Sequence, residues 1–130
     1  MVRALALGAT AIVLAAVDLA YKAGAGAANL HPRSALYVAV VVALTTVWVG
    51  AILAARSTAL ALAGGVLTGG ALGNVLSLAF WSGVPNPLVL DVVAFNAADV
   101  FVLVGFILVG ATVLGLAVRH PERLREPIGV

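Results

Sequence analysis

The sequence predicts an all-α integral membrane protein with four transmembrane helices. Hydrophobic residues make up 64% of its 130 residues, charged residues only 9%, and the mean hydropathy is +1.21. A soluble domain of this size needs more polar surface than that, so lipid is the expected solvent. The apolar runs between the charges are each long enough to cross ~30 Å of hydrocarbon as a helix. We therefore expect a single transmembrane domain.

The boundaries of the four spans follow from charged and turn-forming residues. Arg33 and Arg56 enclose the second run, and Arg119 follows the fourth. The stretch 82–87 carries Ser, Gly, Asn and two Pro and ends the third run. Residues 119–130 are expected to form a cytoplasmic tail. The predicted helices cover about 4–22, 34–55, 57–81 and 96–118.

The first span also imitates a secretory signal peptide, because small residues at 23–27 follow its apolar run like a cleavage site. However, Asp18 and Lys22 fall where a cleavable signal is apolar or small. A helix that stays in the membrane is therefore expected.

The basic residues predict that both termini lie inside, with short outer loops. This orientation places five basic residues in the cytoplasm and two outside. The two groups are Arg3, Arg56, Arg119, Arg123 and Arg125 inside, and Lys22 and Arg33 outside. The chain is therefore expected to cross the membrane several times.

Six polar residues from different segments are predicted to lie at similar height near the outer interface. They are Asp18, Lys22, Asn74, Asp91, Asn96 and Asp99. Asp18 lies ~21 Å along its helix and Asn74 ~25 Å along another that begins at the same inner face. Ionisable groups inside a membrane are costly and often functional. One shared site explains all six residues.

Each of these residues also has a structural interpretation. Asp18 and Lys22, four residues apart, suit an ion pair in which Lys22 extends toward the interface. Asp99 suits a helix N-terminal cap, and Asn74 suits a hydrogen bond between helices. Glycines repeat every four residues on the third predicted helix and favour the close approach of a neighbouring helix. They are Gly65, Gly69 and Gly73.

Composition excludes several classes of site. The chain has no cysteine, which excludes thiolate metal sites, disulfides and cysteine catalysis. His31, expected in a solvated outer loop, and His120 are predicted on opposite sides of the membrane, so a histidine metal site is not expected. The net charge of +2 is too small to suggest nucleic-acid binding.

Three sequence motifs are informative when they are taken together: GGALGN at 69–74, FNAAD at 95–99 and VDLAYK at 17–22. In this order they resemble motifs of lipoprotein signal peptidase, also called signal peptidase II. The resemblance extends over most of the chain and agrees with the predicted topology.

The resemblance implies a membrane aspartyl endopeptidase that removes signal peptides from lipid-modified prolipoproteins. It gives the catalytic roles to Asp91, within residues 89–93, and Asp99. It gives supporting roles to the other members of the polar set: Asn74, Asn96, Asp18 and Lys22. No cofactor is implied, since two carboxyl groups activate a water without metal or nucleotide. The implied partners are the prolipoprotein and membrane lipid, and the implied location is a prokaryotic cytoplasmic membrane.

The sequence departs from the family pattern at several points. Ser77 and Leu78 replace an acidic and a basic residue, and the family's NxGxAF element has no match. The outer segment 23–33 is too short for the small sheet of that family. Asp91 and Asp99 are eight residues apart. On one helix they would lie ~12 Å apart and could not flank one water, whereas a loop that folds back would bring them together.

Two other functions compete with the peptidase. A catalytically inactive homologue would act as a membrane scaffold or accessory subunit with a membrane-protein partner, and the departures above favour it. A small transporter working as a dimer would need an ionisable group near the midplane, whereas these acids are predicted near one face.

Overall fold

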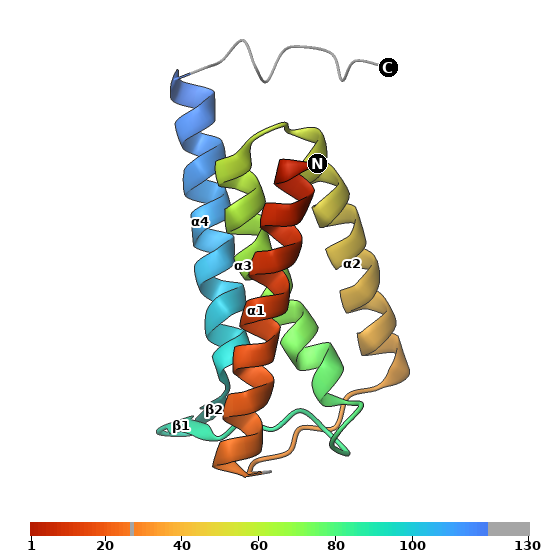
Figure 1. Cartoon of the computed structure of the whole chain (residues 1–130). Coiled ribbons are helices and arrows are strands. Elements are labelled where there is room, and N and C mark those ends of the chain that lie inside the picture. Colours follow the sequence, from red (N-terminus) through yellow and green to blue (C-terminus); the bar gives the residue numbers. More distant parts are fainter. Residues whose placement is uncertain (27, 120–130) are drawn as a thin grey trace.

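A computed structural model describes residues 1–26 and 28–119. Its elements, in order, are α1 (Val2–Ala25), α2 (Ala35–Ala54), α3 (Thr58–Ser77), β1 (Leu88–Leu90), β2 (Val93–Phe95) and α4 (Ala97–Arg119). All four helices are long and apolar enough to cross a membrane, which confirms the four predicted spans (Figure 1). The N-in, C-in orientation stays a prediction, and the tail at 120–130, with His120, lies outside the described residues.

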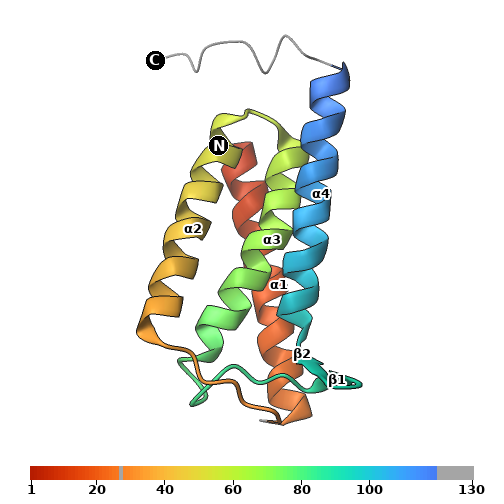
Figure 2. The same ribbon diagram turned by 180° about the vertical axis from the view of Figure 1, so that it is seen from behind.

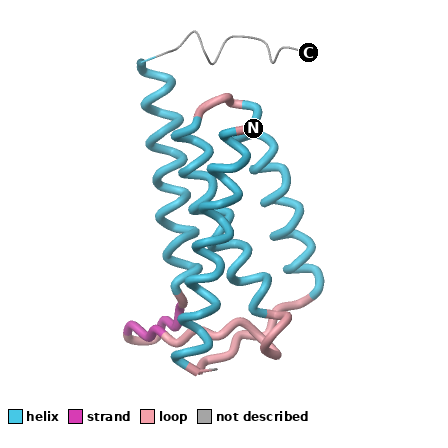
Figure 3. Tube along the Cα trace, viewed as in Figure 1, coloured by secondary structure: helices cyan, strands magenta, loops and turns pink. Residues whose placement is uncertain are grey.

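Helix α3 is the centre of the bundle. It packs along α1 and α4 and more loosely along α2 (Figures 1 and 2). The start of α1 and the end of α4 lie at one end of the bundle, and the strands lie at the other (Figure 3). We call this second end the hairpin end.

Small residues allow α3 to approach its neighbours closely. A methyl group added at Gly69 would lie 3.0 Å from the Ala11 carbonyl oxygen of α1. One added at Gly70 would overlap the Ala98 carbonyl oxygen of α4. The close approach predicted from the four-residue glycine repeat is confirmed. The helix that packs against the repeat is α1, and the glycines that contact it are Gly65, Gly69 and Gly73.

Helix α3 ends at Ser77, four residues before the predicted end at Trp81. The Ser77 carbonyl oxygen accepts hydrogen bonds from the Phe80 and Trp81 backbone N–H groups at 3.1 and 3.0 Å. The chain therefore tightens into turns after Ser77 and leaves the helix axis before the Ser82–Pro87 stretch.

The expectation of an all-α chain needs one correction, because a two-stranded antiparallel hairpin lies between α3 and α4. Leu88 pairs with Phe95 and Leu90 with Val93, which leaves Asp91 and Val92 as a two-residue loop. Val, Leu and Phe favour extended structure, and Asp91 adopts the positive φ, 54°, that a tight hairpin turn uses. Helix α4 therefore does not extend back to Asp91.

Candidate active site

A buried ion pair lies at the hairpin end of α1. The side chains of Asp18 and Lys22 are both fully buried, and Lys22 Nζ donates to Asp18 Oδ2 at 2.6 Å. Lys22 Nζ also donates to Asn74 Oδ1 at 3.1 Å and to Ser77 Oγ at 2.9 Å. These contacts use all three N–H groups of the ammonium. The expectation that Lys22 extends to the interface is therefore wrong, because three acceptors hold it inside the bundle.

Asp18 joins α1 to the start of α4. Its Oδ1 atom accepts a hydrogen bond from the Ala98 backbone N–H at 2.8 Å. This N–H belongs to the first turn of α4, where backbone donors lack helical partners and the helix dipole favours negative charge. Gly73 leaves the necessary room, because a methyl group there would lie 2.6 Å from Asp18 Oδ2.

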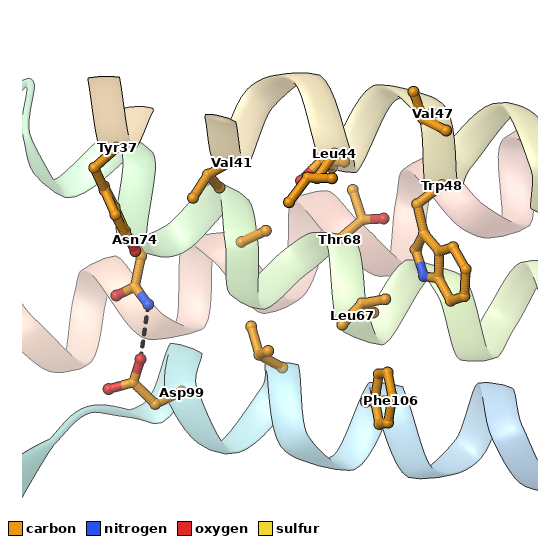
Figure 4. Close-up of a pocket in the computed structure, with 13 residues that line it drawn as sticks. Tyr37, Val41, Leu44, Val47, Trp48, Leu67, Thr68, Asn74, Asp99 and Phe106 are labelled. Carbon is orange, nitrogen blue, oxygen red and sulfur yellow. Dashed lines mark hydrogen bonds between the residues drawn. The ribbon is translucent and has the colours of Figure 1, made fainter. Parts of the chain in front are cut away.

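Asn74 connects the ion pair to Asp99. Its Oδ1 accepts from Lys22 Nζ and, at 3.0 Å, from Asn96 Nδ2. Its Nδ2 donates to Asp99 Oδ1 at 2.9 Å (Figure 4). Since an ammonium group only donates, Lys22 must face the amide oxygen of Asn74. The amide nitrogen therefore points to Asp99.

Asn96 and Asp99 cap α4 reciprocally. The Asn96 backbone N–H donates to Asp99 Oδ2 at 3.1 Å, and the Asp99 backbone N–H donates to Asn96 Oδ1 at 3.0 Å. This is the geometry of a capping box with Asn and Asp in the two positions. The interpretation of Asp99 as a cap is confirmed for Oδ2, while its Oδ1 faces Asn74.

Asn86 is a further member of the polar network that no sequence pattern indicates, and it is only 4% exposed. Its Oδ1 accepts from Asn96 Nδ2 at 2.6 Å, and its Nδ2 lies 2.9 Å from His31 Nδ1. An antiparallel bridge between His31 and Val84 brings these two loops together. Asn86 lies between two prolines, so the sequence alone indicates a turn residue. Only the pairing of distant loops reveals its contact with Asn96.

The structure brings five of the six predicted polar residues together and leaves Asp91 apart. Asp91 is exposed in the two-residue loop at the tip of the hairpin. It lies three residues beyond Leu88, roughly 10 Å along an extended strand. Leu88 pairs with Phe95, next to the cap of α4.

An apolar groove of ≈ 490 Å³ runs between α2, α3 and α4, and the Asn74–Asp99 pair lies at one end of it. Figure 4 shows this pair at one end and the rings of Trp48 and Phe106 at the other. The remaining wall is formed mostly by aliphatic side chains such as Val41, Leu44 and Leu67. Apolar pockets with a few convergent polar groups are the usual form of a ligand site. This groove suits an apolar segment that ends in a polar group.

A model of the signal peptidase (SPase) II family matches residues 10–115. The chain belongs to the signal peptidase II family. The matched range contains all six predicted polar residues, and the family is one of aspartic-type peptidases. With its four apolar helices, the chain is therefore a multi-pass membrane protein of this family. No match was found among curated proteins or among solved structures.

Proposed function

We propose that this signal peptidase II family member is an aspartyl endopeptidase that removes signal peptides from lipid-modified prolipoproteins at the outer face of a prokaryotic cytoplasmic membrane. The observation that supports this most directly is the Asn74–Asp99 pair, joined at 2.9 Å, at the end of the apolar groove. The apolar part of the signal peptide would occupy the groove, and the peptide bond to be cut would lie at Asp99.

The surroundings of Asp99 suit a group that must be held in place before the substrate arrives. One oxygen receives the Asn74 amide, and the other receives the Asn96 backbone N–H. Asn74 is held in turn by Lys22, whose side chain is fully buried. Catalytic groups held by such a supporting layer lose little entropy when the substrate binds.

Hydrolysis by this chemistry needs a second carboxyl group, since one group activates water while the other donates a proton. Asp18 does not suit this role, because Lys22 and the Ala98 N–H occupy its two oxygens. We assign the second role to Asp91. Strand β2 ends at Phe95, directly before Asn96, and the hairpin projects sideways from the bundle on the side of α4 away from α2 (Figures 1 and 2). For catalysis, a rotation about this junction would have to swing the tip back toward Asp99. The hairpin reaches roughly 10 Å from its base, and Asp99 lies about 6 Å along the chain from Phe95.

A second candidate function is binding without cleavage by a catalytically inactive homologue. The position of Asp91 at the exposed hairpin tip favours it. Such a protein would keep the groove and the buried polar residues and would present lipid-modified proteins to a membrane partner.

Cleavage of a diacylglyceryl prolipoprotein by the purified protein in lipid distinguishes the two functions. The peptidase proposal expects cleavage by the wild type and by Thr46→Val, an exposed control on α2. It expects loss of cleavage in Asp91→Asn and Asp99→Asn. If the folded wild type binds the substrate without cutting it, the inactive homologue is correct.

A further inference from the structure

The tip of the hairpin carries an apolar surface that the proposed function does not use. Four aliphatic side chains flank Asp91: Val89, Leu90, Val92 and Val93, which are 61%, 71%, 88% and 59% exposed. We call this surface the apolar tip. Successive side chains of a strand point to opposite faces, so both faces of the hairpin are apolar near its end. A two-stranded hairpin cannot bury these side chains by itself.

Neighbouring residues at the hairpin end have the character of a membrane–water interface. Phe80 and Trp81 follow α3 and contact each other edge to face, with ring centroids 5.8 Å apart. Arg33 lies over the Tyr37 ring, 4.8 Å from its centroid, near the start of α2. Aromatic and basic side chains gather where spanning helices leave the hydrocarbon. The boundary of the membrane therefore falls near the level of the hairpin.

The hairpin leads directly into α4, a helix with large apolar side chains exposed on its outer surface. It projects sideways from the bundle where α4 begins, as both ribbon views show (Figures 1 and 2). Leu103 and Ile107 of α4, which do not line the groove, are 61% and 58% exposed in this apolar helix. A hairpin that leaves the bundle sideways at this level is surrounded by lipid rather than by its own chain.

We propose that the apolar tip is a membrane-contact surface and that its partner is the phospholipid of the leaflet at the hairpin end. In the conformation of this structure, before any substrate-linked rotation of the hairpin, Leu90 and Val92 lie at the boundary between headgroups and acyl chains, and the Asp91 carboxylate is hydrated among the headgroups. Lipid suits this surface better than a protein partner, because both of its faces are apolar and a single docking face would leave one of them in water. The assignment does not depend on peptidase activity.

Spin labelling tests the assignment directly, because the chain has no cysteine and each single-cysteine variant is made in the unchanged protein. Val92→Cys and Leu90→Cys report on the apolar tip. Leu103→Cys, on exposed α4, is the lipid control, and Ala28→Cys, in the exposed loop after α1, is the water control. The protein is placed in vesicles of phosphatidylethanolamine and phosphatidylglycerol. Collisions of each nitroxide with oxygen and with a water-soluble nickel chelate are measured.

The proposal expects positions 90 and 92 to behave like position 103, with an oxygen-to-nickel collision ratio several-fold above that of position 28. A ratio equal to that of position 28 would mean that the tip lies in water and would overturn the proposal. Low collision rates with both reagents, together with an immobilised label, would also overturn it, because the tip would then be packed against protein such as a second copy of the chain. Neither readout involves cleavage, so failure here is distinct from failure of the proposed peptidase.

Discussion

The amide of Asn74 lies between a cation and a carboxylate: its Oδ1 accepts from Lys22 Nζ at 3.1 Å, and its Nδ2 donates to Asp99 Oδ1 at 2.9 Å. Lys22 thus sets the orientation of the group that holds Asp99. Lys22 therefore acts on the end of the groove through the Asn74 side chain.

Replacing Asn74 with Asp should reduce cleavage about 10²-fold, because the donor to Asp99 is lost and a second negative charge is placed beside it. The carboxylate introduced at position 74 would still accept the hydrogen bond from Lys22, so the bundle should stay folded. Asn29→Asp, in the exposed loop after α1, is the control, because it also removes an amide donor, here to the Asn86 carbonyl oxygen at 3.3 Å, and makes no bond to Asp99. Initial cleavage rates in lipid measure the effect, and equal rates for the two variants would contradict the role of Asn74.

Lys22→Met should lower the free energy of unfolding by about 3–5 kcal/mol, since it leaves the fully buried Asp18 carboxylate without its counter-ion. The double variant Asp18→Asn, Lys22→Met should recover part of this loss, because it removes the uncompensated charge and keeps an acceptor for the Ala98 N–H. Reversible unfolding in mild detergent gives both values. A double variant less stable than Lys22→Met would contradict the buried ion pair.

Ser77→Ala should destabilise the bundle by about 1.5–3 kcal/mol, because Lys22 loses one of its three acceptors. Thr112→Val is the matched control, since its hydroxyl donates to the Leu108 carbonyl oxygen at 2.7 Å as Ser77 donates to Gly73 at 2.6 Å. No lysine bonds to Thr112 among the described residues. Equal losses of stability in the two variants would mean that the contact with Lys22 contributes nothing.

Gly73→Ala should destabilise the bundle by about 1–3 kcal/mol, because the new methyl group must displace the Asp18 carboxylate. Gly110 on α4 has no atom within 4 Å of the corresponding position. Gly110→Ala should therefore be neutral or stabilise by up to about 1 kcal/mol. Thermal unfolding compares the two, and a neutral Gly73→Ala would show that α1 and α3 are not held at this distance.

The transmembrane spans and the grouping of the polar residues could be predicted because both follow from positions along the chain. A run without charge between Arg33 and Arg56 predicts a helix, and rise per residue predicts the common height of Asp18 and Asn74. The hydrogen bonds among these residues could not be predicted. The contact of Asn86 with Asn96 depends on two loops that meet through the His31–Val84 bridge.

The hairpin was missed for a different reason. Residues 88–95 are apolar on both faces of the strands, so they lack the alternation of polar and apolar residues that indicates a half-buried strand. The two alternatives for this segment, a helix or a folded-back loop, followed from the spacing of Asp91 and Asp99. The helix alternative is wrong. The segment is extended and does fold back, but as a hairpin that leaves Asp91 at its tip. The early end of α3 was missed because Leu78 and Ala79 are compatible with either a helix or a turn.

Peptidase activity is best tested by a mass spectrum of a diacylglyceryl prolipoprotein after incubation with the protein in lipid made up in ¹⁸O-labelled water. We expect a signal peptide released by a cut immediately before the lipidated cysteine, with one ¹⁸O atom at its new carboxyl end, and no such product from Asp99→Asn. If folded wild-type protein binds the substrate but leaves it intact, the protein is not a peptidase for this substrate.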